Sequence, residues 1–185
     1  MSTLTILDYD DTLLCSTYLQ HTTVSKEILG ELAVKVSALL ETALERGVVA
    51  IVTNGENGWV ELSSAKYIPT VVPLLDKIRV ISARTLYERL YPNSPMKWKY
   101  CAFRDLLNEF HPLNVLSYGD STAEREAVRL LGRERVEIKT KSVKFALRPN
   151  PEQLLRQIEL VISTFKYVCD HCDNLDLHLT CVTLQ

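Results

Sequence analysis

The sequence predicts an α/β fold, a three-layer Rossmann-like arrangement in which about five parallel strands form a sheet flanked by helices. Short apolar runs alternate along the chain with longer amphipathic segments, which is the order that βαβ units produce. Three of these runs end in clusters of polar residues, and ligands of open parallel sheets bind beyond such strand ends. The 185 residues, 46% of them hydrophobic, suffice for one domain with a substantial core.

The first half of the chain contains the clearest strand and helix signals. Residues 4–7 are a β-prone run that stops at the polar sequence DYDDT, which predicts a strand followed by a loop. Apolar residues recur at every third or fourth position over residues 23–46, and Gly47 follows, so we expect an amphipathic helix there. The continuous apolar run at residues 48–52 is typical of a strand buried on both faces.

The second half continues the alternation. Pro112 stops a helix whose apolar positions recur every four residues, and Ser121 is suited to cap the next one. The remaining expected elements are, in order, helix 59–67, strand 78–82, helix 96–111, strand 115–118, helix 123–131, strand 136–138 and a last helix from Pro151 to about residue 168. We therefore expect one domain over residues 1–168, followed by a tail over residues 169–185 that contains cysteine and histidine.

Composition and charge argue against several classes of protein. The 21 Lys and Arg residues nearly balance the 23 Asp and Glu residues, so no nucleic-acid partner is implied. The longest apolar run, residues 48–52, is far shorter than the roughly 20 residues that cross a bilayer, so we expect no membrane partner. Asp8, Asp10 and Asp11 stand where a secretory signal would need its apolar core, which predicts an intracellular, cytoplasmic location. Homo-oligomer formation stays open.

The polar clusters at the strand ends predict a metal site. Asp8, Asp10 and Asp11 follow the first strand within four positions, and their charges would repel one another unless a cation offsets them. Mg²⁺ prefers hard oxygen ligands of this kind. We expect Mg²⁺ as the cofactor, held by Asp8, Asp120 and the main-chain carbonyl of Asp10.

Residues 4–13, LTILDYDDTL, resemble the first motif of the haloacid dehalogenase (HAD) superfamily, an apolar strand followed by DxDxT. In the same order along the chain, Thr53 resembles the second motif, and Asp120 with Glu124 resembles the acidic fourth motif. The resemblance covers about residues 4–138. The aspartate motif is specific, whereas a threonine alone would be a weak signal.

The basic third motif falls in the helix before the fourth strand, where two lysines are available. Lys99 is preferred because it stands four residues before Phe103, a spacing similar to that of small magnesium-dependent phosphatases of this superfamily, and Lys97 is the alternative. The intervals from Asp8 to Thr53 and from Thr53 to Lys99 accommodate crossover elements but no large cap domain. An open site is similar to that of members that act on proteins or other large phosphoesters, or that use a partner subunit as a lid.

The resemblance implies a Mg²⁺-dependent phosphomonoester hydrolase that works through an aspartyl-phosphate intermediate. Asp8 would be the nucleophile, and Asp10 would be the general acid and base. Superfamily members that dehalogenate or pump ions lack an aspartate at the position of Asp10, so this residue points to hydrolysis of a phosphorylated substrate. The expected catalytic residues are Asp8, Asp10, Thr53 and Lys99. The expected phosphate-binding residues are Thr12, Thr53, Asn54 and Lys99.

Several alternatives stay open at this point. Glu124 is either an outer metal ligand or a solvated helix residue paired with a nearby arginine. Trp59 follows the second motif and either packs in the core, which we favour, or lines the site. Two alternatives to the hydrolase hypothesis are a catalytically idle binding module that keeps the fold and a phosphotransferase that uses an acceptor other than water.

The C-terminal tail carries five potential zinc ligands. They are Cys169, His171, Cys172, His178 and Cys181. Their spacing does not match a standard zinc finger or knuckle, so we favour cysteines that pack as small hydrophobic side chains. Cys15 and Cys101 have no partner in sequence, and we expect them to be packing residues as well.

Overall fold

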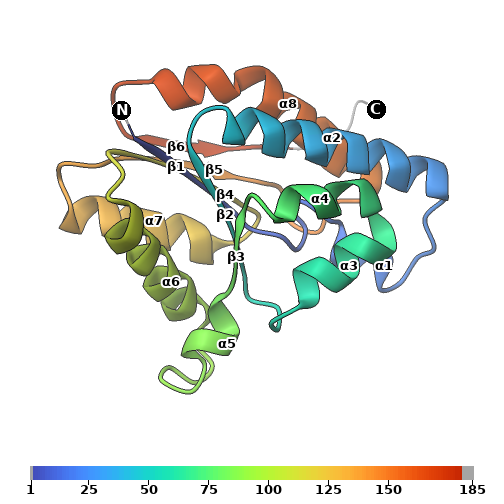
Figure 1. The fold of residues 1–185 in the computed structure, drawn as a ribbon, viewed down its shortest axis with the longest axis horizontal. Helices are drawn as coiled ribbons and strands as arrows, with labels where there is room; N and C mark the ends of the chain where they lie inside the picture. The colour runs from blue at the N-terminus through green and yellow to red at the C-terminus, as the bar shows by residue number, and fades with distance from the viewer. Residues whose placement is uncertain (1, 181–185) are drawn as a thin grey trace.

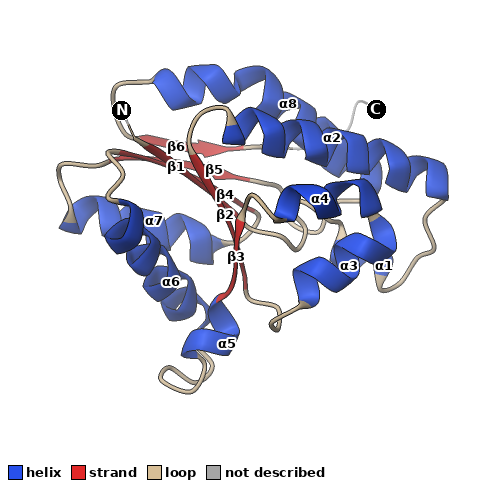
Figure 2. Cartoon of the chain, viewed as in Figure 1, coloured by secondary structure: helices blue, strands red, loops and turns tan. Residues whose placement is uncertain are grey.

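Six parallel strands form the centre of the computed structural model, which describes residues 2–180 (Figures 1 and 2). Their order across the sheet is β3-β2-β1-β4-β5-β6. The strands are β1 (Thr3–Leu7), β2 (Val48–Thr53), β3 (Arg79–Ser82), β4 (Asn114–Gly119), β5 (Lys139–Lys144) and β6 (Leu175–His178). The fold is the expected Rossmann-like α/β arrangement with no cap domain evident among these residues, and the sheet has one strand more than the predicted five.

Helices cover both faces of the sheet and complete three layers (Figure 2). The helices are α1 (Ser16–Leu19), α2 (Lys26–Leu44), α3 (Trp59–Tyr67), the 3₁₀ turn η1 (Pro69–Val71), α4 (Val72–Leu75), α5 (Ala83–Tyr87), α6 (Pro95–Phe110), α7 (Thr122–Glu134) and α8 (Pro151–Asp170). The long helices α2 and α8 pack together on one face, and α6 and α7 pack together on the other (Figure 1). Each of the two faces therefore has its own helical layer.

The alternation of side chains along the strands divides the core into two parts. In β1, Leu4 and Ile6 face the layer of α6 and α7, whereas Leu7 faces the layer of α2 and α8. Val49 and Ile51 in β2 face the layer of α2 and α8, as Leu7 does. Strands β1, β2 and β4 lie inside the sheet, and both of their faces are buried, which explains why their apolar residues predicted these strands well.

The fifth strand was misplaced by the sequence analysis. Residues 136–138 do not form it; Val136 is 83% exposed, and β5 begins at Lys139. The sequence of β5, KTKSVK, has one apolar residue. Its Lys141 is nevertheless buried, because its Nζ donates hydrogen bonds to Asn114 Oδ1 and to the Cys169 carbonyl at the end of α8. A strand buried through polar partners of this kind has no hydrophobic periodicity to detect.

The expected boundary at residue 168 does not coincide with a structural boundary. Helix α8 continues to Asp170, and β6 then pairs in parallel with β5 as the edge strand of the sheet. Cys169 is buried in the core, Cys172 is exposed, and Cys181 lies outside the described residues. The first part of the predicted tail is therefore an integral part of the fold.

Cysteine pairing and membrane insertion can both be assessed over residues 2–180. The four cysteines in this range are unpaired, and Cys15 and Cys101 are buried, as predicted. No helix in this range is long and apolar enough to cross a membrane.

Two glycines near α2 provide a test of the fold. Gly47 has φ +155°, and a Cβ there would overlap the carbonyl oxygen of Thr3, whereas Gly30 is an exposed helix residue with open space around it. We expect Gly47→Ala to lower the free energy of unfolding by more than about 1 kcal/mol and Gly30→Ala to raise it by about 0.5–1 kcal/mol. Urea denaturation of the two variants checks this, and equal effects would contradict the placement of Gly47 against β1.

Candidate active site

The carboxyl ends of three adjacent strands bring the predicted polar clusters to one edge of the sheet. Strand β1 lies between β2 and β4. Asp8 directly follows β1, Thr53 ends β2, and Asp120 directly follows β4. Because all three strands are parallel, residues far apart in the sequence share one edge, as in other open α/β sheets.

A buried lysine joins two of the acidic residues. Lys99 Nζ lies 2.5 Å from Asp8 Oδ1 and 3.0 Å from Glu124 Oε1, and it also donates to the carbonyl oxygen of Val52. The exposed fraction is 0% for Lys99 and 7% for Asp8. Lys97, two positions earlier on α6, is exposed and lies over the ring of Tyr91. Of the two candidate lysines, Lys99 is therefore the one that reaches Asp8.

The charges in this cluster depend on one another. Burial by itself disfavours the Lys99 ammonium, but the carboxylates of Asp8 and Glu124 outweigh it and raise the pKa of Lys99. The pKa of Glu124 is lowered, because Lys99 and Ser121 together overcome its burial. Burial raises the pKa of Asp8 well above its usual value, despite the attraction of Lys99, and the charges of Glu124 and Asp120 add to this effect. The single positive charge of Lys99 therefore does not balance the negative charges of Asp8, Glu124 and Asp120.

Glu124 is not the solvated helix residue that was one of its two interpretations. It is 3% exposed and forms a capping box with Ser121 at the start of α7, in which its Oε2 accepts from the Ser121 backbone N at 3.2 Å. A Cβ at Gly119 would lie 2.6 Å from Glu124 Cγ, so only glycine allows this approach of the helix to the strand end. Glu124 therefore positions Lys99 and lies beside Asp8.

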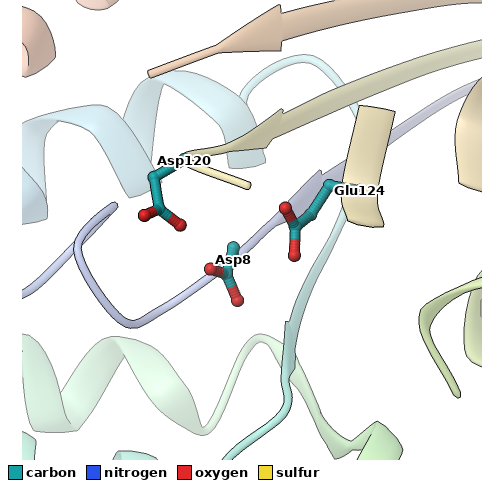
Figure 3. A group of neighbouring side chains, drawn as sticks. All are labelled: Asp8, Asp120 and Glu124. Carbon is teal, nitrogen blue, oxygen red and sulfur yellow. The ribbon is translucent and has the colours of Figure 1, made fainter. Parts of the chain in front are cut away.

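Three carboxylates offer a candidate metal site (Figure 3). Ligand atoms of Asp8, Asp120 and Glu124 all lie within 4.8 Å of one another, and no other group of three acidic, histidine or cysteine side chains within residues 2–180 comes as close. Burial, Glu124 and Asp11 raise the pKa of Asp120 to about 7. Oxygen donors with excess negative charge fit a hard divalent cation such as Mg²⁺. The potential zinc ligands of the tail form no such group within residues 2–180.

The side chain of Asp10 points to a different set of partners. Its Oδ2 accepts from Thr53 Oγ1 at 3.2 Å, and its Oδ1 accepts from Trp59 Nε1 at 3.0 Å. The Asp10 carboxylate is thus not part of the group formed by Asp8, Asp120 and Glu124. Trp59 is partly buried and packs against the core, as the sequence analysis favoured. The sequence analysis missed its contact with Asp10, for which the glycines at positions 55 and 58 were the available signal.

The other expected phosphate-binding residues border this arrangement. The hydroxyl of Thr12 is buried and has no hydrogen-bond partner among the described residues, so it is free to donate. The Asn54 Oδ1 atom is also buried and unpartnered in this part of the chain. Because a carbonyl oxygen only accepts hydrogen bonds, Asn54 could contact a phosphoryl oxygen only through its amide nitrogen. Thr12 can therefore donate through its hydroxyl and Asn54 through its amide nitrogen.

Two further residues of the first motif, Tyr9 and Asp11, have structural partners. Tyr9 is buried, and its hydroxyl lies 2.8 Å from Ser63 Oγ and 2.9 Å from Ser64 Oγ on α3. Burial raises the pKa of Tyr9 to about 12. Asp11 adopts φ +54°, and its Oδ1 accepts from the backbone N of Thr17 at 3.0 Å. Both residues hold the loop after β1 in place.

Comparisons of the chain with protein-family models, with curated proteins and with solved structures gave no match in any of the three.

The two lysines of α6 allow a matched test of the buried ion pairs. Lys99→Met would leave Asp8 and Glu124 buried without their counter-ion, so we expect it to lower the free energy of unfolding by about 3 kcal/mol or more. Lys97→Met removes an exposed lysine and should change it by less than about 0.5 kcal/mol. Urea denaturation at neutral pH measures both. A Lys99→Met protein as stable as Lys97→Met would refute the buried cluster.

The raised pKa of Asp120 predicts a pH dependence of stability in the presence of chelator. An unfolded aspartate has a pKa of about 3.9, so between about pH 4 and about pH 7 the folded protein binds the Asp120 proton more tightly than the unfolded chain. Stability from this group is present at low pH and is lost as the pH rises towards 7. The stability of Asp120→Asn relative to the unchanged protein should therefore rise as the pH increases from about 4 to about 7. If urea denaturation shows the same pH dependence of the free energy of unfolding for both proteins, the raised pKa of Asp120 is contradicted.

Proposed function

We propose that the protein is a Mg²⁺-dependent phosphomonoester hydrolase of the HAD type that works through an aspartyl-phosphate intermediate. The observation that carries this proposal is the contact between the buried Lys99 ammonium and Asp8 at the end of β1. A carboxylate held by an ammonium at the mouth of a parallel sheet is suited to attack an electrophilic phosphorus. The DxDxT sequence and the acidic residues after β4 support the same proposal.

Asp8 is the proposed nucleophile. Lys99 fixes its Oδ1, which leaves the second carboxylate oxygen to form the bond to phosphorus. Thr12, Thr53 and Lys99 are the proposed donors to the phosphoryl oxygens, since phosphoryl transfer depends mostly on positioning and electrostatics. Asp8 and Asp120 would hold Mg²⁺ together with the main chain at Asp10, and Glu124 lies next to them. The ion would supply positive charge to offset that of the phosphoryl oxygens.

Asp10 is the proposed general acid and base. In the first step Asp8 forms a bond to phosphorus, the bond to the leaving oxygen breaks, and Asp10 gives its proton to that oxygen. In the second step Asp10 takes a proton from water, the water oxygen bonds to phosphorus, and the bond to Asp8 breaks. A catalytically idle module would need no second carboxylate two positions after the first.

The proposed substrates are phosphorylated proteins or other large phosphoesters in the cell interior. No cap domain is evident over residues 2–180, and the connection between β2 and β3 contains only α3, η1 and α4. Of these short elements, η1 and α4 contact α2 in the helical layer, and α3 packs on η1 and α4, so they do not form a separate enclosure for a small metabolite. An intracellular location belongs to the same proposal.

Hydrolysis of p-nitrophenyl phosphate tests the proposal. We expect turnover that requires Mg²⁺ and falls by about 10³-fold or more in Asp8→Asn, because the amide cannot act as the nucleophile. Asp76→Asn is the matched control, since Asp76 is exposed at the end of α4 and has no ion-pair partner in the described part of the chain; it should keep the original rate.

Turnover that survives in Asp8→Asn, or that is unaffected by chelator, would contradict the proposed mechanism. Release of the phenol without an equal amount of inorganic phosphate, in the presence of an alcohol, would instead identify a phosphotransferase.

A further inference from the structure

The two oxygens of Asp10 have different donors, and this difference is built into the loop after β2. Thr53 ends that strand and contacts Oδ2, whereas Trp59 begins α3 and contacts Oδ1. Each oxygen thus has one side-chain donor. The carboxylate is held at a fixed rotation about its Cβ–Cγ bond, between two residues that are six positions apart in the sequence.

Two glycines allow the indole to reach Asp10. A Cβ on Gly55 would lie 2.6 Å from Trp59 Cδ1, so the ring lies directly against the backbone at that position. Gly58 has φ +85° and precedes the first residue of α3, which allows the loop to turn sharply into the helix. The Gly55 amide also donates to Thr53 Oγ1 at 2.8 Å, which ties the two donors of Asp10 into one loop.

The two donors differ in chemistry. An indole N–H can only donate, so the oxygen that it contacts is stabilised without a proton. A threonine hydroxyl can rotate and can also accept. When the Thr53 hydroxyl turns to a phosphoryl oxygen, Oδ2 of Asp10 is released, while Trp59 still holds Oδ1.

We infer that Trp59 is a positioning residue for Asp10: its indole N–H holds Oδ1 and leaves Oδ2 as the oxygen that passes a proton to the leaving group. This inference rests on the proposed function. In the first step the proton on Oδ2 moves to the leaving oxygen as the bond from phosphorus to that oxygen breaks and the bond to Asp8 forms. Trp59 itself exchanges no proton and forms no covalent bond in this step.

The dependence of rate on the leaving group separates this role from a merely structural one. Protonation matters most for a poor leaving group, so phenyl phosphate needs the acid more than p-nitrophenyl phosphate does. We expect Trp59→Phe to lower kcat/KM for phenyl phosphate by about 10- to 100-fold, and for p-nitrophenyl phosphate by less than about 3-fold. The ratio kcat/KM is suitable because it covers the steps up to the phosphoenzyme.

The other tryptophan of the chain is the matched control. Trp98 Nε1 donates to the Tyr91 carbonyl at 2.7 Å and makes no contact with Asp10, so Trp98→Phe removes the same N–H and the same volume elsewhere. Its effect should be equal for the two esters. Gly55→Ala is a second variant that keeps the indole but displaces it, and it should reproduce the unequal losses of Trp59→Phe. Circular dichroism checks that each variant is folded.

The outcomes separate the two proposals. Equal losses for the two esters in Trp59→Phe, with Asp8-dependent turnover in the unchanged protein, would overturn the role of Trp59 and leave the proposed function intact. If the unchanged protein hydrolyses neither ester, or if Asp8→Asn keeps the rate, the proposed function fails and the role of Trp59 fails with it.

Discussion

The candidate site depends on one buried ammonium. Lys99 on α6 contacts Asp8 after β1, Glu124 on α7 and the carbonyl of Val52 in β2, so a single atom connects four elements. A buried charge is costly unless it is paired and hydrogen-bonded, and these partners supply both. The same contacts leave the carboxylates in excess, since Asp120 also lies in the cluster, which makes this edge of the sheet receptive to a further cation.

In the loop after β1, one residue anchors the loop in the core and two carboxylates have separate partners. Asp8 points to Lys99, Asp10 points to Thr53 and Trp59, and Tyr9 between them contacts the serines of α3. The buried tyrosine anchors the loop in the core, and the two carboxylates are thereby held at separate places with separate donors. A nucleophile and a general acid need this kind of separation, because each must keep its own protonation state during the reaction.

Hydrophobic patterning predicted most of the fold because the central strands and the long helices are stabilised by apolar burial. Strands β1, β2 and β4 and helices α2, α6 and α8 fall close to their predicted ranges for this reason. Strand β5 was misplaced because Lys141 is satisfied by an amide and a helix-terminal carbonyl rather than by apolar neighbours. The short edge strand β6 alternates between apolar and polar residues, but its place beside β5 depends on a pairing that an isolated segment cannot reveal.

The sequence by itself determined the order of strands and helices and the polar residues that follow each strand, since both depend on local periodicity. It also supplied Asp8, Asp10, Thr53 and Asp120 as candidates, because strand ends are recognisable from neighbouring residues. Only the tertiary structure showed that Lys99, the preferred one of the two lysines, reaches Asp8, that Glu124 is buried beside it, and that Trp59 contacts Asp10. These contacts join residues up to 91 positions apart, and such pairings depend on how helices pack on the sheet, which no local pattern encodes.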